Sequence, residues 1–284
     1  MPVLPSSLLE PIWIEFAALL PERGEYDPTH PLGCHRRRVP DRVVFEHVIA
    51  ALVHGSGYER IAGPGCSDST IRRRLRSWAA AGLGERVHAL VLAAFDRMIG
   101  LQLTDLAVDG CITKAVSGGA HVGRSPVDRG KGGRKRSVVT DGGGVPLGVV
   151  AAGANRHDGP LLGPTLDAAI DQVGPRWPDL VTVHLDAGYD SIPTRHLLAG
   201  RGWTGRISRR GRPAPVQAGR RWVVEADHAW MNGFGKLRRH TDRHPAVIDF
   251  YHYLAAAIVT LRALIRRART HYRWTGMPTT RRLQ

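Results

Sequence analysis

The 284-residue sequence predicts an α/β protein in which an all-helical region precedes a mixed β-sheet flanked by helices. In the first hundred positions, apolar residues recur at the three- and four-residue spacing of buried helix faces. Beyond Gly100 the pattern changes to short apolar runs bounded by glycine, and three predicted strands precede alternating helices and strands, which indicates a layered α/β domain. We place the helical domain at residues 1–99, the α/β domain at 100–272 and a C-terminal tail at 273–284.

The first two predicted helices lie in the N-terminal third. A short helix is expected at about residues 8–20. A second helix begins at Asp41, which can cap it, and carries Val44 and Val48 on one face. Gly55 ends this helix because glycine readily adopts the conformation that terminates helices.

A third helix begins at Ser67 or Asp68 and carries Ile71, Leu75 and Trp78 on a single face. Two helices joined by a tight turn, with basic side chains on the outer face of the second, predict a helix-turn-helix that binds DNA. An arginine face that is merely solvated on an ordinary helical bundle is the alternative. A last helix, about residues 86–98, closes the helical domain.

The α/β domain is predicted from glycine punctuation and strand-like apolar runs. Gly142–Gly144 separates two such runs and favours a hairpin between them. The strands are expected at 104–113, 134–140, 145–152, 180–185 and 204–208, and the helices at 160–173, 193–199, 223–238 and 245–269. Between the first two strands lies a basic, glycine-rich loop, residues 117–133.

The charge distribution indicates a polyanionic partner. The formal net charge is +15, and residues 201–284 contain 18 Lys and Arg but only four Asp and Glu. Such an excess favours nucleic acid first and an anionic membrane second. The most apolar run, residues 254–265, is shorter than a membrane span and contains Arg262. We therefore expect no membrane association.

Cysteine usage and the N-terminal residues favour the cytoplasm. The three cysteines, Cys34, Cys66 and Cys111, include no closely spaced pair, which argues against a disulfide framework or a cysteine zinc site. The first residues have neither the basic start nor the uninterrupted apolar run of a signal peptide. A cytoplasmic protein is expected, and the family resemblance given below implies one that is bacterial and nucleoid-associated.

Three carboxylates are candidates for chemistry. Asp109 lies in an apolar strand, Asp186 ends another, and Glu225 starts a helix in the basic C-terminal third. Hard oxygen ligands without paired Cys or His suit Mg²⁺ or Mn²⁺, and three such groups can hold two ions that clamp a phosphodiester. Taken singly, each acid could instead be a turn residue, a cap or a helix N-terminal charge. Asp190 is the alternative to Asp186 as the second ligand.

The segments VDGCITKA, GVVAAGANRHD, VHLDAGYDS and RRWVVEADHAWMNGFGKLRR occur in the order found in DDE transposases. The chain resembles a transposase of a bacterial insertion sequence, of the large insertion sequence 5 group, with an RNase H-like catalytic core. The resemblance implies that Asp109, Asp186 and Glu225 are the catalytic residues and the ligands of two Mg²⁺ or Mn²⁺ ions. The family tends to have a basic residue four positions before the glutamate, here Arg221. A further helix cation is expected near Asn232, and Lys236 lies beyond it.

The resemblance implies a cut-and-paste transposase that cleaves DNA at transposon ends and transfers the strand into target DNA. Its partners would be the double-stranded DNA of the terminal inverted repeats and of the target, bound by a homodimer. The candidate DNA-binding residues are Arg72, Arg73, Arg76, Arg221, Lys236, Arg238 and Arg239. A catalytically inactive or repurposed DNA-binding protein is one alternative, and an RNase H-like nuclease that cuts without joining is another.

Several further residues receive structural interpretations. Asn155, His157 and Asp158 are expected to orient the loop after the third strand, and His184 to pack against the sheet. Trp230 and Phe234 are expected to form a core contact on one helix face.

Overall fold

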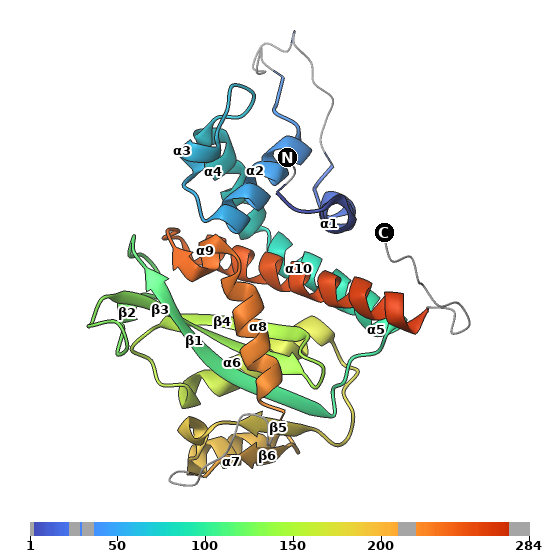
Figure 1. Ribbon diagram of the computed structural model, residues 1–284, viewed down its shortest axis with the longest axis vertical. Coiled ribbons are helices and arrows are strands. Elements are labelled where there is room, and N and C mark those ends of the chain that lie inside the picture. The colour runs from blue at the N-terminus through green and yellow to red at the C-terminus, as the bar shows by residue number, and fades with distance from the viewer. Residues whose placement is uncertain (1–2, 23–28, 30–36, 210–219, 273–284) are drawn as a thin grey trace, which may run out of the picture.

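The structure, a computed structural model, describes residues 3–22, 29, 37–209 and 220–272. The predicted tail 273–284 and Cys34 lie outside these residues. Figure 1 shows a group of short helices above a long helix, with the sheet below it. The helices are α1 (Ser6–Ala18), α2 (Asp41–His54), α3 (Tyr58–Ile61), α4 (Asp68–Ala80), α5 (Leu83–Met98), α6 (Gly159–Val173), α7 (Ile192–Gly200), α8 (Trp222–Asn232), α9 (Gly235–Arg238) and α10 (Pro245–His271). The strands are β1 (Asp105–Ala115), β2 (Gly123–Arg124), β3 (Gly132–Asp141), β4 (Pro146–Gly153), β5 (Thr182–Leu185), β6 (Thr204–Ile207) and β7 (Arg239–His240), and a 3₁₀ turn, η1, spans Ala187–Tyr189.

The sheet is mixed, as predicted. β4, β3 and β1 are antiparallel neighbours, and β5 and β6 continue the sheet parallel to β1. Two short strands complete the sheet, with β2 paired to β3 and β7 paired to β1; both are two residues long and were not predicted. The predicted fold class, an RNase H-like mixed sheet flanked by helices and preceded by a helical region, is confirmed.

Different helices pack on the two faces of the sheet. Arg136 on β3 contacts α8, whereas its neighbour Ser137 accepts a hydrogen bond from Thr165 on α6. Successive side chains of a strand point to opposite faces, so α8 and α6 lie on opposite sides of β3. Figure 1 shows α8 running across the near side of β1 and β3.

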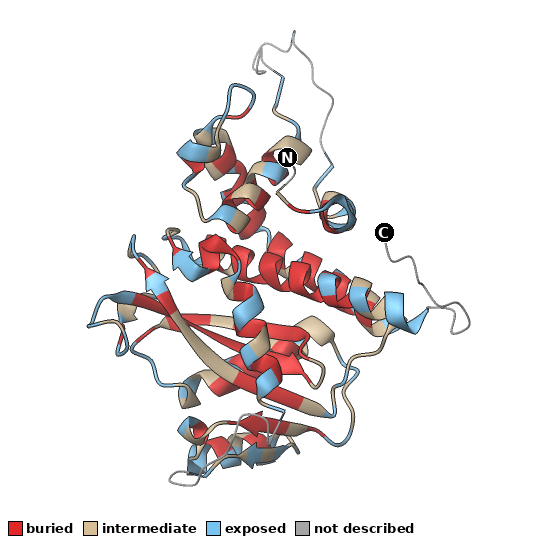
Figure 2. Cartoon of the chain, in the orientation of Figure 1, coloured by how far each residue is buried: buried red, intermediate tan, exposed pale blue. Residues whose placement is uncertain are grey.

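One hydrophobic cluster runs through both predicted domains. The ring of Phe16 on α1 lies 4.9 Å from Trp78 on α4 and 6.3 Å from Phe250 on α10, measured between centroids. Figure 2 shows α10 buried along most of its length between the upper helices and the sheet. The domain boundary near Gly100 stays a prediction, but the two sides share this core.

α10 is long and apolar enough to cross a membrane by length and composition. However, 78% of its most apolar window is buried inside the protein. Its apolar face is therefore already covered by the chain itself, as expected for the core helix of a globular fold.

The single helix predicted at 223–238 is wrong. The structure has two helices, α8 and α9, separated at Gly233 and Phe234. A Cβ atom at Gly235 would lie 2.6 Å from the backbone nitrogen of Gly55, so α9 approaches the end of α2 more closely than a side chain would permit. A turn before Gly235 delivers that glycine to α2, which a continuous helix would not.

Candidate active site

Asp109 lies on β1, just beyond the segment of β1 that pairs with the parallel strand β5. β1 pairs with β5 from Asp105 to Ala107, and two residues further on Asp109 pairs only with Val138 of β3. The Asp109 carboxylate accepts a 2.7 Å hydrogen bond from the backbone nitrogen of Gly110. The apolar run before Asp109 is fully buried, so the strand fixes the position of this acid.

Asp186 follows the last residue of β5. Its Oδ1 accepts a 2.8 Å hydrogen bond from the backbone nitrogen of Gly188 and begins the η1 turn. Asp190, the alternative candidate, forms a 2.5 Å ion pair with Arg195 at the start of α7. The structure thus gives Asp190 a partner of its own.

Glu225 lies in the first turn of α8 and is exposed. Beside it on the helix, Val223 and Val224 are buried and hold α8 against the protein. An acidic side chain in a first helical turn is favoured by the positive end of the helix dipole. The fold therefore presents Glu225 to solvent from a fixed helix.

The charges of Asp186 and Glu225 affect the pKa of Asp109. Burial is the largest cause that raises the pKa of Asp109, to about 7, and the hydrogen bond from Gly110 opposes it. The charge and hydrogen bond of Glu225, and the charge of Asp186, raise this pKa further. Carboxylates that disfavour each other's ionised form in this way are arranged for a cation to stabilise.

The donor set fits a divalent metal. Three carboxylates supply the hard oxygen ligands that Mg²⁺ and Mn²⁺ prefer, and their mutual repulsion is what a bound cation would relieve. Within the described residues, no three His, Cys, Asp or Glu side chains converge closely enough to hold one ion as they stand. Asp109 accepts a hydrogen bond from the amide of the next residue in β1, and Asp186 accepts one from an amide of the η1 turn.

A fourth carboxylate lies beside these acids and was not predicted to belong there. Both oxygens of Asp158 accept 2.9 Å hydrogen bonds from the ammonium of Lys135. A Cβ atom at Gly110 would lie 2.2 Å from Oδ1 of Asp158, so this ion pair touches the residue after Asp109. The predicted role of Asp158 in orienting its loop agrees with the pair, and its closeness to Asp109 is additional.

Tyr189 lies near three of the four acids, Asp109, Asp158 and Asp186. Its side chain is buried. Burial raises the pKa of its hydroxyl, the charges of Asp158, Asp109 and Asp186 raise it further, and a hydrogen bond with Ser137 lowers it. The Gly-Tyr pair of the quoted motif DAGYD was the sequence signal for this residue, but it does not by itself indicate which acids surround the hydroxyl.

The buried guanidinium of Arg136 fixes α8 to the sheet. Arg136 on β3 donates a 3.0 Å hydrogen bond to Oδ1 of Asn232, and Nδ2 of Asn232 donates to the sulfur of Cys111 at 3.5 Å. Burial raises the pKa of Asp227 to about 7, although the charge of Arg136 lowers it. The positive charge expected from α8 near Asn232 comes instead from β3.

The predicted helix-turn-helix residues have different environments. α2 and α4 pack together and are joined through α3 and a turn at 63–66. On α4, Arg73 and Arg76 are exposed. Arg72 instead forms ion pairs of 3.2 Å with both Glu59 and Asp68. A DNA contact by these arginines stays a prediction.

The prediction that Lys236 contacts DNA is wrong for this structure. Lys236 is only 2% exposed, and its ammonium lies 3.1 Å from Oδ2 of Asp242 and donates a 2.8 Å hydrogen bond to Thr241. It also lies 4.5 Å from the centre of the Tyr58 ring. The break before α9 turns this lysine inward, away from the exposed face of α8.

The remaining predicted cations lie at the surface or at its edge. Arg238 and Arg239 are exposed and line a hollow of about 550 Å³ at the far end of β1. Arg221 precedes α8 and is partly exposed.

The core contact predicted between Trp230 and Phe234 is not formed on one helix face. Phe234 is buried beyond the end of α8, whereas Trp230 is 37% exposed and has the guanidinium of Arg266 over its ring. The prediction for His184 is confirmed, since it is buried in the sheet 2.8 Å from Oδ1 of Asp105.

Comparison with known proteins identifies relatives of this chain. Two curated relatives come from Burkholderia cepacia. A "putative transposase for insertion sequence element IS402" is 34% identical over 153 residues, which is 52% of this chain and 72% of the relative. An "insertion element IS402 uncharacterized 16.2 kDa protein" is 32% identical over 120 residues, 40% of this chain and 78% of the relative.

Among solved structures, the Mos1 mariner paired-end complex with Mn matches with a TM-score of 0.33 and 10% identity, over 93% of this chain and 87% of that one. The Mos1 strand transfer complex matches with a TM-score of 0.33 and 11% identity, over 75% and 73%. A likeness this weak carries no argument about the site. By contrast, residues 102–259, more than half of the chain, match the family of the transposase DDE domain. The chain belongs to this family and is a DDE transposase of an insertion sequence.

Proposed function

We propose that this protein excises its insertion sequence and joins it to new DNA, by metal-dependent cleavage at the transposon ends followed by strand transfer. The observation that carries the proposal is the approach of Asp109, Asp186 and Glu225 from a strand, a strand end and a helix. Membership of the DDE transposase family supports it. The proposed setting is the bacterial cytoplasm.

Two phosphoryl transfers make up the proposed reaction. In the first, water attacks a phosphodiester at the transposon end, the P–O bond to the 3′ oxygen breaks, and a free 3′-hydroxyl results. In the second, that hydroxyl attacks a target phosphodiester, forms a new P–O bond and displaces the target's own 3′ oxygen. No covalent bond to the protein is required in either step.

Asp109, Asp186 and Glu225 would hold two Mg²⁺ or Mn²⁺ ions. Bound there, the ions supply Lewis-acid stabilisation of the attacking and leaving oxygens. The chain's own contribution is positioning: β1 and the end of β5 fix two acids, and the Arg136–Asn232 bond fixes the helix that carries the third. Pre-organised ligands lower the cost of assembling the site in each catalytic cycle.

The partner is proposed to be double-stranded DNA, with two transposon ends held by a homodimer. The net charge of +15 and its concentration in the last third of the chain support a phosphate-rich partner. The exposed Arg73, Arg76, Arg238 and Arg239 are the residues proposed to contact it.

A joining assay tests the proposal. The full-length chain is mixed with duplex ending in the element's own terminal inverted repeat, a supercoiled target plasmid and Mg²⁺ or Mn²⁺. Hydrolysed ends and joined products are resolved on one gel. Wild type is expected to yield both, and Asp109→Asn and Glu225→Gln neither. Asp190→Asn is the matched control, because Asp190 lies near Asp186 in sequence but pairs with Arg195.

The same assay separates the alternatives. Cleavage without joining would identify an RNase H-like nuclease. Binding of the repeat without either product would identify a DNA-binding protein that lacks catalysis. Joining that survives in the Asp109→Asn or Glu225→Gln variant would show that the assignment of these acids is wrong.

A further inference from the structure

Three polar side chains connect the three elements that carry the candidate acids. Asp105 is the first residue of β1, His184 lies on β5, and Arg220 lies two residues before α8 begins. Nε2 of His184 lies 2.8 Å from Oδ1 of Asp105, and Nη1 of Arg220 lies 3.4 Å from Oδ2 of Asp105. We call these three residues the Asp105 cluster.

Each member of the Asp105 cluster precedes one candidate acid on the same element. The three pairs are Asp105 and Asp109 on β1, His184 and Asp186 at β5, and Arg220 and Glu225 at α8. Because side chains of a strand alternate between its faces, Asp105 and Asp109 project from the same face of β1. Cys111 shares that face and accepts a hydrogen bond from Asn232, so this is the face that α8 covers.

Asp105 holds its two partners as an ionised carboxylate. Burial raises its pKa, but the hydrogen bond from His184 and the charge of Arg220 outweigh burial, so the pKa lies below its ordinary value of 3.8. An ionised carboxylate can only accept hydrogen bonds, and Nε2 of His184 is therefore the donor. His184 is 2% exposed, which shields this hydrogen bond from water.

The turn between β3 and β4 leaves room for Arg220. A Cβ atom at Gly142 would lie 2.6 Å from Nη1 of Arg220, and one at Gly144 would lie 3.5 Å from Cβ of Val223 on α8. The three glycines that indicate a hairpin in the sequence thus also lie against the start of α8. A side chain at position 142 would push the guanidinium of Arg220 away from its place beside Asp105.

α8 is attached to the sheet at both ends. Asn232 at its end accepts a hydrogen bond from Arg136, and Arg220 before its start pairs with Asp105. Glu225 lies in the first turn of α8, so the Asp105 cluster is the nearer attachment. Because this attachment also includes β1 and β5, it fixes Glu225 relative to the two strands that carry the other acids.

We propose that Asp105 is a positioning residue, which holds β1, β5 and the start of α8 so that the three acids can bind divalent cations together. Four residues of strand separate Asp105 from Asp109 by about 13 Å, so Asp105 would not bind the ions itself. Residues that orient metal ligands without touching the metal commonly change its affinity tenfold or more. The inference rests on the proposed function, since it assumes that the acids bind metal.

Binding of Mn²⁺ alone tests the proposal. The full-length chain is titrated with Mn²⁺, and free Mn²⁺ is measured by electron paramagnetic resonance. Asp105→Ala removes both contacts and should weaken Mn²⁺ binding about tenfold, the value of one charge-assisted hydrogen bond. Arg220→Gln removes only an exposed ion pair and should weaken it about threefold. The double variant should bind no more weakly than Asp105→Ala, because Arg220 acts through Asp105.

Hydrogen exchange supplies a readout that needs no metal. In Asp105→Ala the backbone amides of residues 222–228 should exchange faster, because the start of α8 has lost its attachment to β1. Gly142→Ala should reproduce this change by displacing Arg220. Arg220→Lys keeps the positive charge and should stay closer to wild type than Arg220→Gln in both measurements.

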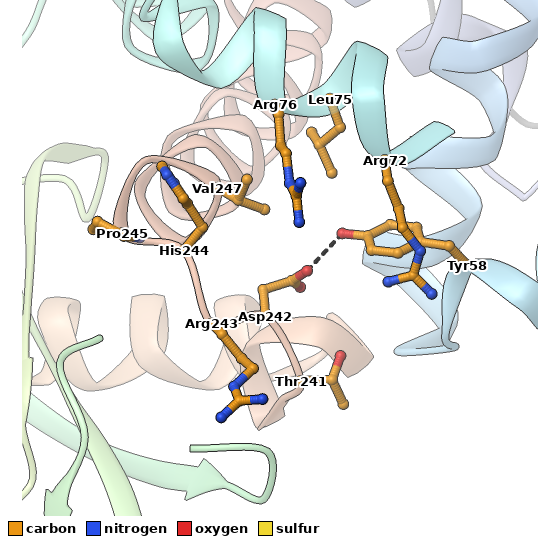
Figure 3. A pocket seen from close by; sticks show the side chains of 10 residues that line it. All are labelled: Tyr58, Arg72, Leu75, Arg76, Thr241, Asp242, Arg243, His244, Pro245 and Val247. Atoms are coloured by element: carbon orange, nitrogen blue, oxygen red, sulfur yellow. Dashed lines mark hydrogen bonds between the residues drawn. The ribbon is translucent and has the colours of Figure 1, made fainter. Parts of the chain in front are cut away.

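The matched control loses a hydrogen bond to a carboxylate on segments that carry none of the acids. Tyr58 on α3 donates a 2.7 Å hydrogen bond to Oδ1 of Asp242, across a hollow between α4 and the segment before α10 (Figure 3). Tyr58→Phe should lower the urea midpoint, because this bond is lost, yet it should keep the wild-type affinity for Mn²⁺. Equal weakening of Mn²⁺ binding in Tyr58→Phe and Asp105→Ala would show a general effect of stability and overturn the proposal.

Failure of this inference is distinguishable from failure of the proposed function. If wild type neither binds Mn²⁺ nor joins DNA, both are wrong. If wild type joins DNA and Asp105→Ala binds Mn²⁺ as wild type does, or exchanges at the wild-type rate in α8, only the positioning role of Asp105 is wrong. Arg220→Gln changes an exposed side chain, so it keeps the test decisive even if Asp105→Ala does not fold.

Discussion

The guanidinium of Arg136 on β3 donates a 3.0 Å hydrogen bond to Asn232 at the end of α8. Asn232 stands where the family resemblance leads one to expect a basic residue. Because Arg136 is fully buried and already occupies this position with a positive charge, a second cation there would be repelled and desolvated. The structure thus explains an asparagine that the sequence left as a departure from the family pattern.

Asn232→Lys should therefore destabilise the protein, although it restores the expected residue. We expect the free energy of unfolding to fall by about 2 kcal/mol, from lost hydrogen bonding and like-charge repulsion. Urea unfolding with an unchanged m-value is the measurement. Asn232→Asp, which keeps an acceptor for Arg136, serves as the comparison, and a lysine variant as stable as wild type would contradict the prediction.

Gly110→Ala should disturb the site through its contact with Asp158. The new Cβ would lie 2.2 Å from Oδ1 of Asp158, so either β1 or the Lys135–Asp158 pair must move. Overpacking of this kind costs about 1–3 kcal/mol and should also reduce strand transfer. Gly159→Ala is the matched control, since nothing lies within 4 Å of a Cβ there. Equal stability of the two variants would argue against the contact.

Asp109→Asn should abolish strand transfer yet stabilise the metal-free protein. The folded pKa of Asp109, about 7, exceeds its ordinary value of 3.8, so its contribution to stability falls as the pH rises between these values. Above neutral pH the asparagine variant escapes this cost. Thermal unfolding at about pH 8 should give a higher Tm for the variant than for wild type.

Divalent cations should reverse that order. Mg²⁺ or Mn²⁺ binds the folded wild type and raises its Tm by mass action, whereas the variant lacks one ligand. A variant that melts below wild type without metal, or that gains as much from Mg²⁺, would contradict the electrostatic account of the three acids.

Mild acid should destabilise the fold through His88. Its Nδ1 lies 2.8 Å from Gln172 Oε1, and its Nε2 lies 3.0 Å from the carbonyl oxygen of Pro146. Burial lowers the pKa of His88 to about 4, from 6.5. Because the unfolded chain binds the proton more readily, stability is lost as the pH falls from 6.5 to 4, by about 3 kcal/mol for this group.

The His88→Gln variant isolates that contribution. Its stability should fall less steeply over the same pH interval than that of wild type, as measured by urea unfolding at several pH values. Subtracting the two profiles removes the effect of the other buried histidines, His184, His228, His240 and His252. Parallel profiles would show that His88 does not carry the effect.

Local pattern accounts for most of what the sequence predicted about the fold. The helix at Asp68–Ala80 begins where Ser67 caps it, and Ile71 and Trp78 are buried as their spacing indicates. The mixed sheet followed from the order of apolar runs. These features depend on residues close together in the chain, which a sequence displays directly.

The misplaced features depend on contacts between distant residues. The break at Gly233 results from the close approach of Gly235 to Gly55, and the inward turn of Lys236 follows from that break. A strand of two residues, such as β7, is too short to show an alternating pattern in the sequence. Only its pairing with β1 defines it as a strand.

For the candidate site, the motifs indicated Asp109, Asp186 and Glu225, and the charges of Glu225 and Asp186 raise the pKa of Asp109; their catalytic role stays a prediction. They did not indicate Lys135, which reads as one of several cations in a basic strand. Its importance appears only when the loop after β4 brings Asp158 beside Gly110. Pairs such as Lys135 and Asp158 are brought together by the topology of the fold. The spacing of residues in the sequence does not reveal them.

The hydrogen bond between Tyr58 and Asp242 joins the proposed DNA-reading helices to the segment that leads into α10. Under the proposed function, this joint sets a fixed distance along the DNA. Each base pair advances a duplex by about 3.4 Å, so a fixed joint fixes the number of base pairs between the recognised sequence and the phosphate that is cut. If the end of an insertion sequence gained or lost one base pair, the wrong phosphate would lie at the catalytic site. That insertion sequence would then not be excised. The joint would thereby keep the ends of the element constant in length over generations of copying.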